Sequence, residues 1–375
     1  MYHRKVPSKG KYARGEDDGR GKGKKGRAGR GRRPTRSRGT AATMPMALLL
    51  DGSMGHELKQ RGVVRSFQDA MLANRDLADV VTAVHADYVA AGCDVLTTNT
   101  FTLTPEALAD VGREAELPSL LHAACECARQ AAAGSSKTVL LAGSLPPLRH
   151  CYLRELCNSE ADMVPLYTRI VQELAPRVDL FLAETLCCSA EARAALSAAA
   201  PSGKPCWLSL TLHDDVAASA SQPPALRGGE SVRELLSALT SRASGAPIVP
   251  KALLYNCCAP QVVTRALATQ PTLPSAVERT GGYANGFEST TSEWLYREGA
   301  EMMGCTKEPH HFDSCPICAE DFAEGTLTPA AYCEHAQRWA ANGASVIGGC
   351  CGIGPAHLRA VHTRWRQRKG PREKS

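Results

Sequence analysis

The stretch Ala344-Ser345-Val346-Ile347-Gly348-Gly349-Cys350-Cys351-Gly352-Ile353-Gly354-Pro355 joins an apolar run, a glycine-rich turn and two adjacent cysteines. Residues 345–347 have the pattern of a short strand that crosses a protein core. The run stops at two glycines, and a helix is expected near Pro355, because proline is common in a first helical turn. Glycine allows sharp turns that other residues resist. The stretch therefore predicts a strand-to-helix connection that presents both cysteines.

These two cysteines are better suited to a metal than to each other. Neighbouring thiols make a strained disulfide, whereas both sulfurs can face one soft cation. A third thiol is available at Cys257, which also follows an apolar, strand-like run, at residues 254–256. Three thiolates with one open position are typical of a catalytic zinc site. The sequence therefore predicts that Cys257, Cys350 and Cys351 bind Zn²⁺ and are the catalytic residues.

Length and composition narrow the class of protein. The chain has 375 residues, enough for one large α/β barrel or two ordinary domains. No apolar stretch approaches the roughly 20 residues that cross a bilayer. The 16 cysteines are scattered through strand-like and helix-like segments, and no signal peptide precedes them. This usage favours a reducing, cytoplasmic location.

The basic charge of the chain is concentrated at its start. Residues 1–45 hold 15 lysines and arginines against three acidic residues, and the remainder has a net charge of −6. Residues 1–45 have too few apolar side chains to form a core, which predicts a disordered extension. It has three interpretations: an RNA-binding or nuclear-targeting arm, an organelle-transit segment, or a dispensable extension upstream of a start at Met44 or Met46. Residues 369–375 are expected to form a short charged tail.

Strand-like and helix-like segments then alternate along residues 46–368. Strands are expected at 46–50, 94–99, 138–143, 178–184, 205–210, 251–256, within 276–283 and at 345–347. Helices are expected at 57–60, 77–91, 105–133, 161–176, 189–200, 230–240, 262–269, 329–342 and 355–366. Eight such units predict an α/β fold of the (β/α)8 TIM-barrel type. A doubly wound sheet is disfavoured, because no GxGxxG follows the first strand and the candidate site residues follow strands that only a barrel brings to one rim.

The chain resembles the homocysteine S-methyltransferase family. The resemblance covers roughly residues 46–365, and the double-cysteine motif with an upstream Asn–Cys pair is its most specific part. The matching stretches, in family order, are Leu50-Asp51-Gly52-Ser53-Met54-Gly55, Leu96-Thr97-Thr98-Asn99-Thr100-Phe101, Leu141-Ala142-Gly143-Ser144-Leu145-Pro146-Pro147, Ala183-Glu184-Thr185-Leu186, Asn256-Cys257, Tyr283-Ala284-Asn285 and Ile347-Gly348-Gly349-Cys350-Cys351-Gly352.

The resemblance implies the same three zinc ligands, with Asn285 as a further candidate ligand when no substrate is bound. Cys258 is expected to be a bystander. Asp51 and Glu184 match carboxylates that face the ammonium group of the substrate. The alternative for Asp51 is a cap on the following helix. Gly52 and Asn99 lie in matched motifs and are further expected substrate contacts, Gly52 through backbone amides that hold the substrate carboxylate.

The implied reaction is zinc-dependent methyl transfer from an onium donor to the thiol of homocysteine, which gives methionine. S-methylmethionine or S-adenosylmethionine is the favoured donor. Betaine–homocysteine and selenocysteine methyltransferases are alternatives, because the named residues do not separate them. Onium cations bind aromatic faces. The candidates for this contact lie near strand ends, and each fits core packing equally well: Phe101, Tyr255 and Tyr283.

Two further expectations concern other parts of the chain. Residues 305–318 contain a CxxC pair and other potential ligands, which fit either a second, structural zinc site or an exposed loop: Cys305, His310, His311, Cys315 and Cys318. A hypothesis of another class is a zinc- and homocysteine-binding regulatory protein with an RNA-binding arm. Small-molecule substrates are the expected partners, no membrane contact is expected, and the sequence leaves the oligomeric state open.

Overall fold

A computed structural model of the chain describes residues 47–65, 67–149, 152, 154, 157–214, 221–241, 247–287 and 326–367. The expected basic extension at residues 1–45, the charged tail at 369–375 and the candidate second zinc site at 305–318 lie outside the described residues.

Eight parallel strands form a barrel, which confirms the predicted (β/α)8 fold. Each strand pairs with its neighbours in the order β1-β8-β7-β6-β5-β4-β3-β2, and a parallel bridge between Leu50 and Val95 joins the two ends of this order. The strands are β1 (Leu48–Leu49), β2 (Val95–Thr97), β3 (Leu140–Leu145), β4 (Leu180–Leu186), β5 (Cys206–Leu210), β6 (Ala252–Asn256), β7 (Arg279–Tyr283) and β8 (Val346–Ile347).

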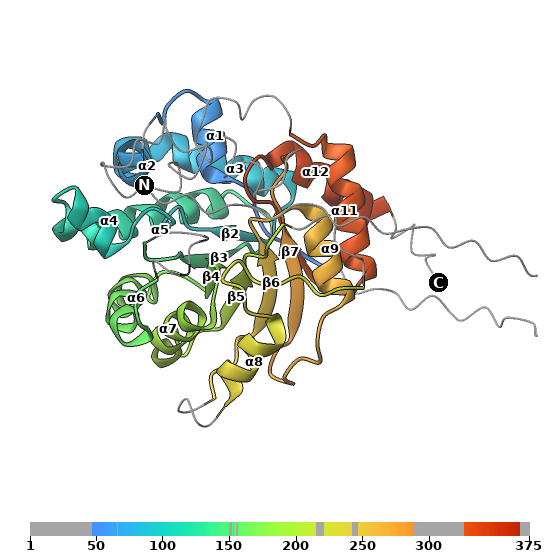
Figure 1. Cartoon of the computed structure of the whole chain (residues 1–375). Coiled ribbons are helices and arrows are strands. Elements are labelled where there is room, and N and C mark those ends of the chain that lie inside the picture. The colour runs from blue at the N-terminus through green and yellow to red at the C-terminus, as the bar shows by residue number, and fades with distance from the viewer. Residues whose placement is uncertain are drawn as a thin grey trace, which may run out of the picture. The chain divides into compact units, whose positions relative to one another are not determined.

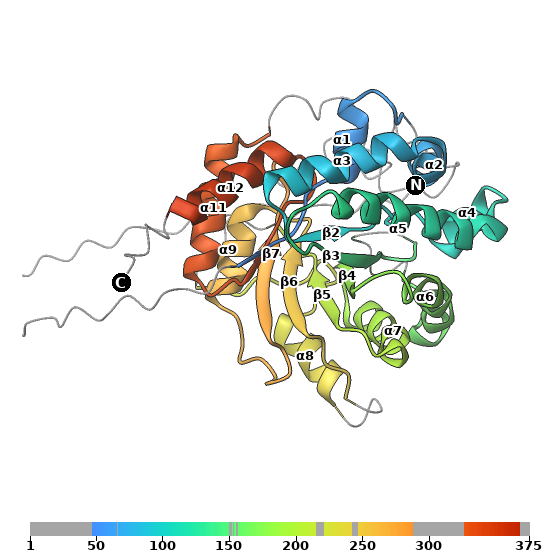
Figure 2. The same cartoon turned by 180° about the vertical axis from the view of Figure 1, so that it is seen from behind.

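Helices surround these strands in both views of the molecule (Figures 1 and 2). They are α1 (Met54–Gln60), α2 (Phe67–Asp76), α3 (Ala78–Ala91), α4 (Pro105–Asp110), α5 (Leu117–Ala133), α6 (Glu160–Leu174), α7 (Ser189–Ala199), α8 (Val232–Thr240), α9 (Pro260–Ala268), α11 (Pro329–Ala341) and α12 (Pro355–Gln367). Short 3-10 turns lie at Glu114–Glu116 and Ala200–Ser202. Helix α2 was not predicted, and the predicted helix at 105–133 is divided into α4 and α5.

Capping residues explain where several helices begin and end. Ser159 and Thr328 accept hydrogen bonds from the backbone in the first turns of α6 and α11, and Ser231 forms a capping box with Glu234 at the start of α8. Gly92 ends α3 with a φ of 103°. Glycine adopts this left-handed conformation without steric cost, so the predicted stop is confirmed.

The core has two layers, one inside the barrel and one between the strands and the helices. Side chains alternate between these layers along β6, where Ala252 and Leu254 face inward and Leu253 and Tyr255 face the helices. The Tyr255 hydroxyl accepts a hydrogen bond from Gln270 at 3.2 Å in the outer layer. Of the two interpretations of Tyr255, core packing is therefore the one that the structure supports.

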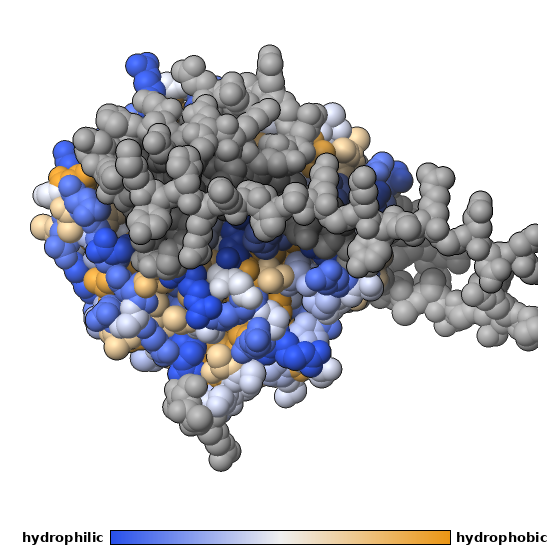
Figure 3. All heavy atoms as spheres, in the orientation of Figure 1, coloured by the Kyte–Doolittle hydropathy of each residue, from blue (hydrophilic) through white to orange (hydrophobic). Residues whose placement is uncertain are grey.

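Where Figure 3 shows described residues, hydrophobic ones are scattered among hydrophilic ones. Among the large hydrophobic residues described, only Phe101 is exposed, with 37% of its surface accessible. Within the described ranges, no helix combines the length and the apolar character that a bilayer crossing requires.

Asp94 holds the seam at which β1 meets β2. Its carboxylate accepts a hydrogen bond from the backbone of Leu49 at 2.9 Å and pairs with Lys137 at 2.6 Å. Its own N–H donates to the Leu49 carbonyl at 2.6 Å. One side chain thus fixes the point where the first and second strands close the barrel.

Asp94→Ala should lower the free energy of unfolding by about 1–3 kcal/mol, because it leaves the Leu49 N–H without its acceptor. Urea denaturation measures this change. The matched control is Asp87→Ala, which removes only an exposed ion pair with Arg61 and should cost less than about 1 kcal/mol. Equal effects of the two substitutions would contradict the assigned role of Asp94.

Candidate active site

The predicted site residues gather at the carboxyl ends of the strands, where TIM barrels carry their active sites. They come from six strands: Asp51 follows β1, Asn99 follows β2, Glu184 lies near the end of β4, Cys257 follows β6, Asn285 follows β7, and Cys350 and Cys351 follow β8. Segments far apart in the chain therefore contribute to one rim.

The three predicted cysteines lie together. Their sulfur atoms are all within 4.8 Å of one another, and those of Cys350 and Cys351 are 4.0 Å apart. Cys257 is buried, whereas the other two are half-buried. Two hydrogen bonds hold the pKa of the Cys257 thiol well below its usual value, and the one from Cys350 has a larger effect than the one from Cys351. This donor set fits a zinc ion with three sulfur ligands and one open position.

Backbone hydrogen bonds between the strand ends bring these sulfurs together. The N–H of Cys350 donates to the Ala284 carbonyl at 3.0 Å, and the N–H of Asn285 donates to the Cys258 carbonyl at 3.0 Å. The ends of β6, β7 and β8 are therefore joined. Cys258 belongs to the outer core, away from the sulfur cluster, in agreement with its expected role as a bystander.

The glycines around the cluster are required by close packing. A Cβ atom on Gly52 would lie 2.3 Å from the carbonyl oxygen of Ile353, and one on Gly349 would lie 2.1 Å from the Ile353 side chain. The N–H of Gly349 also donates to the Asp51 carbonyl at 3.0 Å. The turn after β8 can therefore pack against the loop after β1 only if both positions lack a side chain.

Tyr152 contacts the sulfur cluster and was not predicted. Its hydroxyl lies 2.8 Å from the Cys257 sulfur, and its φ of 78° is left-handed. The guanidinium of Arg227 lies 5.1 Å from the centre of its ring and pairs with Asp214 at 3.0 Å. Tyr152 lies in the connection between β3 and α6, in a segment without strand or helix periodicity, so the sequence carried no signal for it.

Asp51 is oriented by β2 and does not cap the following helix. Its two carboxylate oxygens accept hydrogen bonds from the N–H and the hydroxyl of Thr97, at 2.7 and 2.8 Å. The cap of α1 is Ser53. Burial raises the pKa of Asp51 to about 8, against the opposing effect of the Thr97 hydrogen bonds, and the nearby Glu184 also raises it.

Glu184 is the second buried carboxylate of the rim. It accepts hydrogen bonds from the hydroxyls of Ser144 at 2.5 Å and Tyr283 at 3.2 Å. Burial raises the pKa of Glu184 to about 7, and the two hydrogen bonds act in the opposite direction. Neither Glu184 nor Asp51 forms an ion pair with any residue that the structure describes. Buried carboxylates are costly unless paired, so the rim is suited to a cationic group.

A bulge in β4 directs Glu184 toward the rim. The pairing of β4 with β5 shifts register between Ala183 and Leu186, and Thr185 has a left-handed φ of 61°. Asn256 holds this conformation: its amide oxygen accepts from the Thr185 N–H at 3.0 Å, and its amide nitrogen donates to the Thr185 hydroxyl at 2.8 Å. Its oxygen also accepts from Ser209 at 2.8 Å. The sequence marked Asn256 only as part of a motif.

Asn99, an expected substrate contact, is engaged with α2. Its amide donates to the Asn74 side chain at 3.0 Å, and Asn74 donates back to the Asn99 carbonyl at 2.8 Å.

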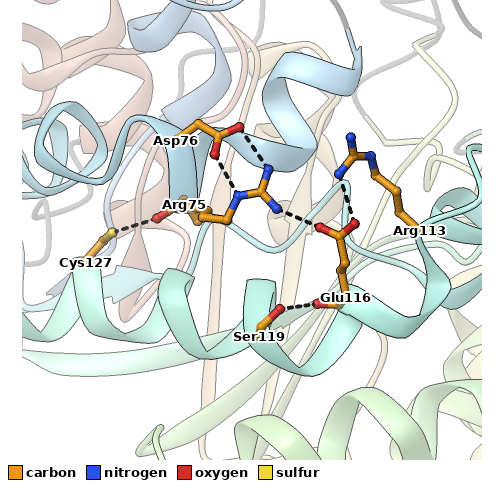
Figure 4. A network of polar contacts seen from close by, with 7 residues as sticks. Arg75, Asp76, Arg113, Glu116, Ser119 and Cys127 are labelled. Atoms are coloured by element: carbon orange, nitrogen blue, oxygen red, sulfur yellow. Dashed lines mark hydrogen bonds and ion pairs between the residues drawn. The ribbon is translucent and has the colours of Figure 1, made fainter.

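Figure 4 shows how α2 is held: Arg75 pairs with Asp76 and with Glu116, which precedes α5. The thiol of Cys127 on α5 donates to the Asn74 carbonyl at 3.7 Å. The loop after β2 is thereby fixed, with Phe101 exposed beside it.

A family model described as homocysteine S-methyltransferase matches residues 48–365. The chain belongs to the homocysteine S-methyltransferase family. The resemblance stated from the sequence motifs is thereby confirmed. The match spans the whole barrel, from β1 to α12, and includes the three clustered cysteines and both buried carboxylates.

Curated relatives carry the same family name. The homocysteine S-methyltransferase of Escherichia coli (strain K12) is 28% identical over 340 residues, which cover 84% of this chain and 94% of that protein. Homocysteine S-methyltransferase 4 of Zea mays is 25% identical, covering 84% of this chain and 87% of the relative. Betaine–homocysteine S-methyltransferase 1 of Danio rerio is 26% identical, and the match covers 83% of this chain and 71% of the relative.

A solved structure supports the fold independently. The metallated form of the homocysteine methyltransferase from Escherichia coli superposes with a TM-score of 0.64 and 24% sequence identity, and the match covers 85% of this chain and 96% of that one. At this identity the likeness concerns the fold, which is the same barrel.

Asn256→Ala should lower the free energy of unfolding by roughly 2–4 kcal/mol, because it leaves the buried Thr185 N–H and the Ser209 hydroxyl without their acceptor. Chemical denaturation measures the change, and Asn342→Ala, an exposed helix-end position, serves as the matched control. A loss no larger than that of the control would contradict the role of Asn256 in holding the bulge.

Proposed function

We propose that this member of the family is a zinc-dependent homocysteine S-methyltransferase that uses a sulfonium donor such as S-methylmethionine or S-adenosylmethionine and forms methionine. The convergence of three thiols within 4.8 Å, on the rim that also holds Asp51 and Glu184, carries the proposal. The names of the Escherichia coli and maize relatives support the acceptor.

Cys257, Cys350 and Cys351 would hold the zinc ion. When bound, zinc supplies a Lewis acid with an open position that lowers the pKa of an incoming thiol. The Tyr152 hydroxyl, 2.8 Å from the Cys257 sulfur, makes a hydrogen bond that fixes this sulfur. The Gly348–Gly349 turn holds the other two sulfurs on the same side of the rim, because Gly349 is bonded to the Asp51 carbonyl.

Asp51 and Glu184 would bind the ammonium group of homocysteine. Both are buried, and Thr97, Ser144 and Tyr283 orient them through hydrogen bonds. Because burial raises the pKa of both carboxyls, an ammonium ion beside them favours their ionised form and gains a charge-assisted hydrogen bond. This contact sets the orientation of the amino acid, so that its sulfur reaches the three cysteines.

The methyl group would move by in-line displacement. The homocysteine sulfur forms a bond to the methyl carbon as the bond from this carbon to the donor's positively charged sulfur breaks. The donor leaves as a neutral thioether, and the proton of the homocysteine thiol is released to solvent. Tyr283 at the inner rim and the exposed Phe101 are the aromatic groups that remain as candidates for contact with the onium group.

Glycine betaine is the second candidate donor. The similarity to the zebrafish betaine–homocysteine S-methyltransferase, which extends over 83% of this chain, favours glycine betaine. This chain matches 94% of the Escherichia coli protein but only 71% of the zebrafish one, which weakens the case for betaine. The family resemblance of the sequence then favours the sulfonium donor. Both donors present a cation to the same acceptor sulfur, so the choice between them does not change the roles of the cysteines.

The test is methionine formation from homocysteine with S-methylmethionine, S-adenosylmethionine or glycine betaine, with and without a zinc chelator. We expect turnover with a sulfonium donor, its loss on chelation and its return with added zinc. Cys350→Ala should abolish turnover and remove one zinc per chain, whereas Cys258→Ala, the matched control, should retain both. Full turnover by metal-free Cys350→Ala would overturn the mechanism, and homocysteine binding without turnover with any donor would favour a regulatory role.

Glu184→Gln should raise the KM for homocysteine by about 10–100-fold, because it replaces a charge-assisted hydrogen bond worth about 1.5–3 kcal/mol with a neutral one. Zinc content should stay unchanged, since Glu184 is not among the sulfur ligands. Glu173→Gln, on the outer face of the barrel in α6, is the control and should change neither value. Loss of zinc with an unchanged KM would contradict the assigned contact.

A further inference from the structure

A second cluster of metal-binding side chains lies outside the three-cysteine cluster. One ligand atom from each of Cys157, Cys187, Cys188 and Glu191 lies within 4.8 Å of the others. Cys157 precedes α6, the two adjacent cysteines follow β4, and Glu191 lies in the first turn of α7. The two clusters share no residue. None of these four residues was singled out from the sequence, because their proximity depends on two separate loops.

The cluster is buried and contains a carboxylate without a cation. Glu191 is 2% exposed, Cys187 and Cys188 are 0% and 2% exposed, and Cys157 is half-buried. The Glu191 carboxylate accepts hydrogen bonds from the Cys187 N–H at 2.8 Å and from the Cys188 thiol at 3.9 Å. No lysine, arginine or histidine in the described ranges forms an ion pair with it. Buried charges are normally paired or bound to metals.

The connection between β5 and α8 covers the cluster on one side. The N–H of Gly228 donates to the Cys187 carbonyl at 3.0 Å, and a Cβ atom there would lie 2.4 Å from that oxygen and 3.2 Å from the Cys188 side chain. Arg154 contacts the Gly228 carbonyl at 3.2 Å and pairs with Glu230 at 3.1 Å. The donors are therefore enclosed by packed backbone, as in a structural site.

We propose that Cys157, Cys187, Cys188 and Glu191 bind a second Zn²⁺ ion, which has a structural role. Three thiolates and one carboxylate make a complete tetrahedral set, so no position remains open for a substrate. Thiolate-rich sites select zinc over the hard cations magnesium and calcium, which prefer oxygen ligands. The first cluster differs in offering three protein ligands.

The ion would join two loops of the active site. Cys157 ends the connection from β3 to α6, which also carries Tyr152, the residue that contacts the Cys257 sulfur. Cys187 follows β4 directly, three positions after Glu184. A metal bound between them would fix the loop that carries Tyr152 to strand β4. This strand carries Glu184, the carboxylate that is proposed to bind the substrate.

Oxidation of two of these thiols to a disulfide is the competing use of the cluster. A disulfide needs an oxidant and joins only two sulfurs, which leaves the third thiol and Glu191 without a role. A metal uses all four side chains. The two explanations can be separated experimentally. Only a metal site requires the Glu191 carboxylate, and only a disulfide survives chelation.

The first test is the zinc content of the purified full chain, compared between variants so that zinc bound elsewhere cancels. Cys157→Ser and Glu191→Gln should each lose one zinc per chain, and Cys350→Ala should lose a different one. Cys206→Ser, a buried cysteine outside both clusters, is the matched control and should lose none. Unchanged zinc in both Cys157→Ser and Glu191→Gln would overturn the proposal.

The second test starts from the unaltered protein, in which no folding defect can mimic metal loss. After exchange with ¹¹³Cd²⁺, NMR should show two resonances in the thiolate-rich range from these clusters. Cys350→Ala should remove one, and adding Cys157→Ser should remove the other. A single thiolate-rich resonance that disappears in Cys350→Ala, or a disulfide between two of the three thiols in the zinc-replete protein, would overturn the proposal.

Discussion

The register between β6, β7 and β8 is the constraint on which the site depends. Asn256 pairs with Tyr283, and Gly282 pairs with Ile347, so the three strands end side by side. A slip of one residue would turn every side chain of a strand to the opposite layer. The sulfurs of Cys257, Cys350 and Cys351 can therefore meet only in this register. The sulfur cluster is therefore a property of the barrel's closure and not of any one segment.

Strained backbone surrounds this meeting point. Among the described residues, only Tyr152, Thr185 and Cys257 are non-glycine residues with positive φ, and all three contact or adjoin the site. Each such residue costs about 1–3 kcal/mol and persists only where neighbours enforce it. Asn256 bonds to Thr185, and the Thr211 hydroxyl donates to the Cys257 carbonyl at 3.2 Å. This strain keeps the thiol and the carboxylate aimed at the rim before substrate arrives.

The sequence predicted the parts of the site that follow from strand ends and not those that depend on loops. Cys257 and the 350–351 pair were recognised because strand-end residues of a barrel share one rim. For Tyr255, donor contact and core packing stayed open, because a motif alone does not reveal to which side strand alternation turns a side chain. Tyr152 and the cluster around Glu191 come from irregular connections, whose contacts have no periodic signal.

Charge explains why this rim suits cationic ligands. Three thiols and the carboxylates of Asp51 and Glu184 collect in a largely buried space. The pKa of Cys257 is lowered there, first by hydrogen bonds from Cys350 and Cys351 and to a lesser degree by the charge of Arg227. Taking several anionic groups out of water is unfavourable unless cations accompany them. In the function proposed above, a metal ion would balance the sulfurs and an ammonium group would balance the carboxylates. An amino acid that carries both a thiol and an ammonium group would meet both demands at once, as the proposed reaction requires.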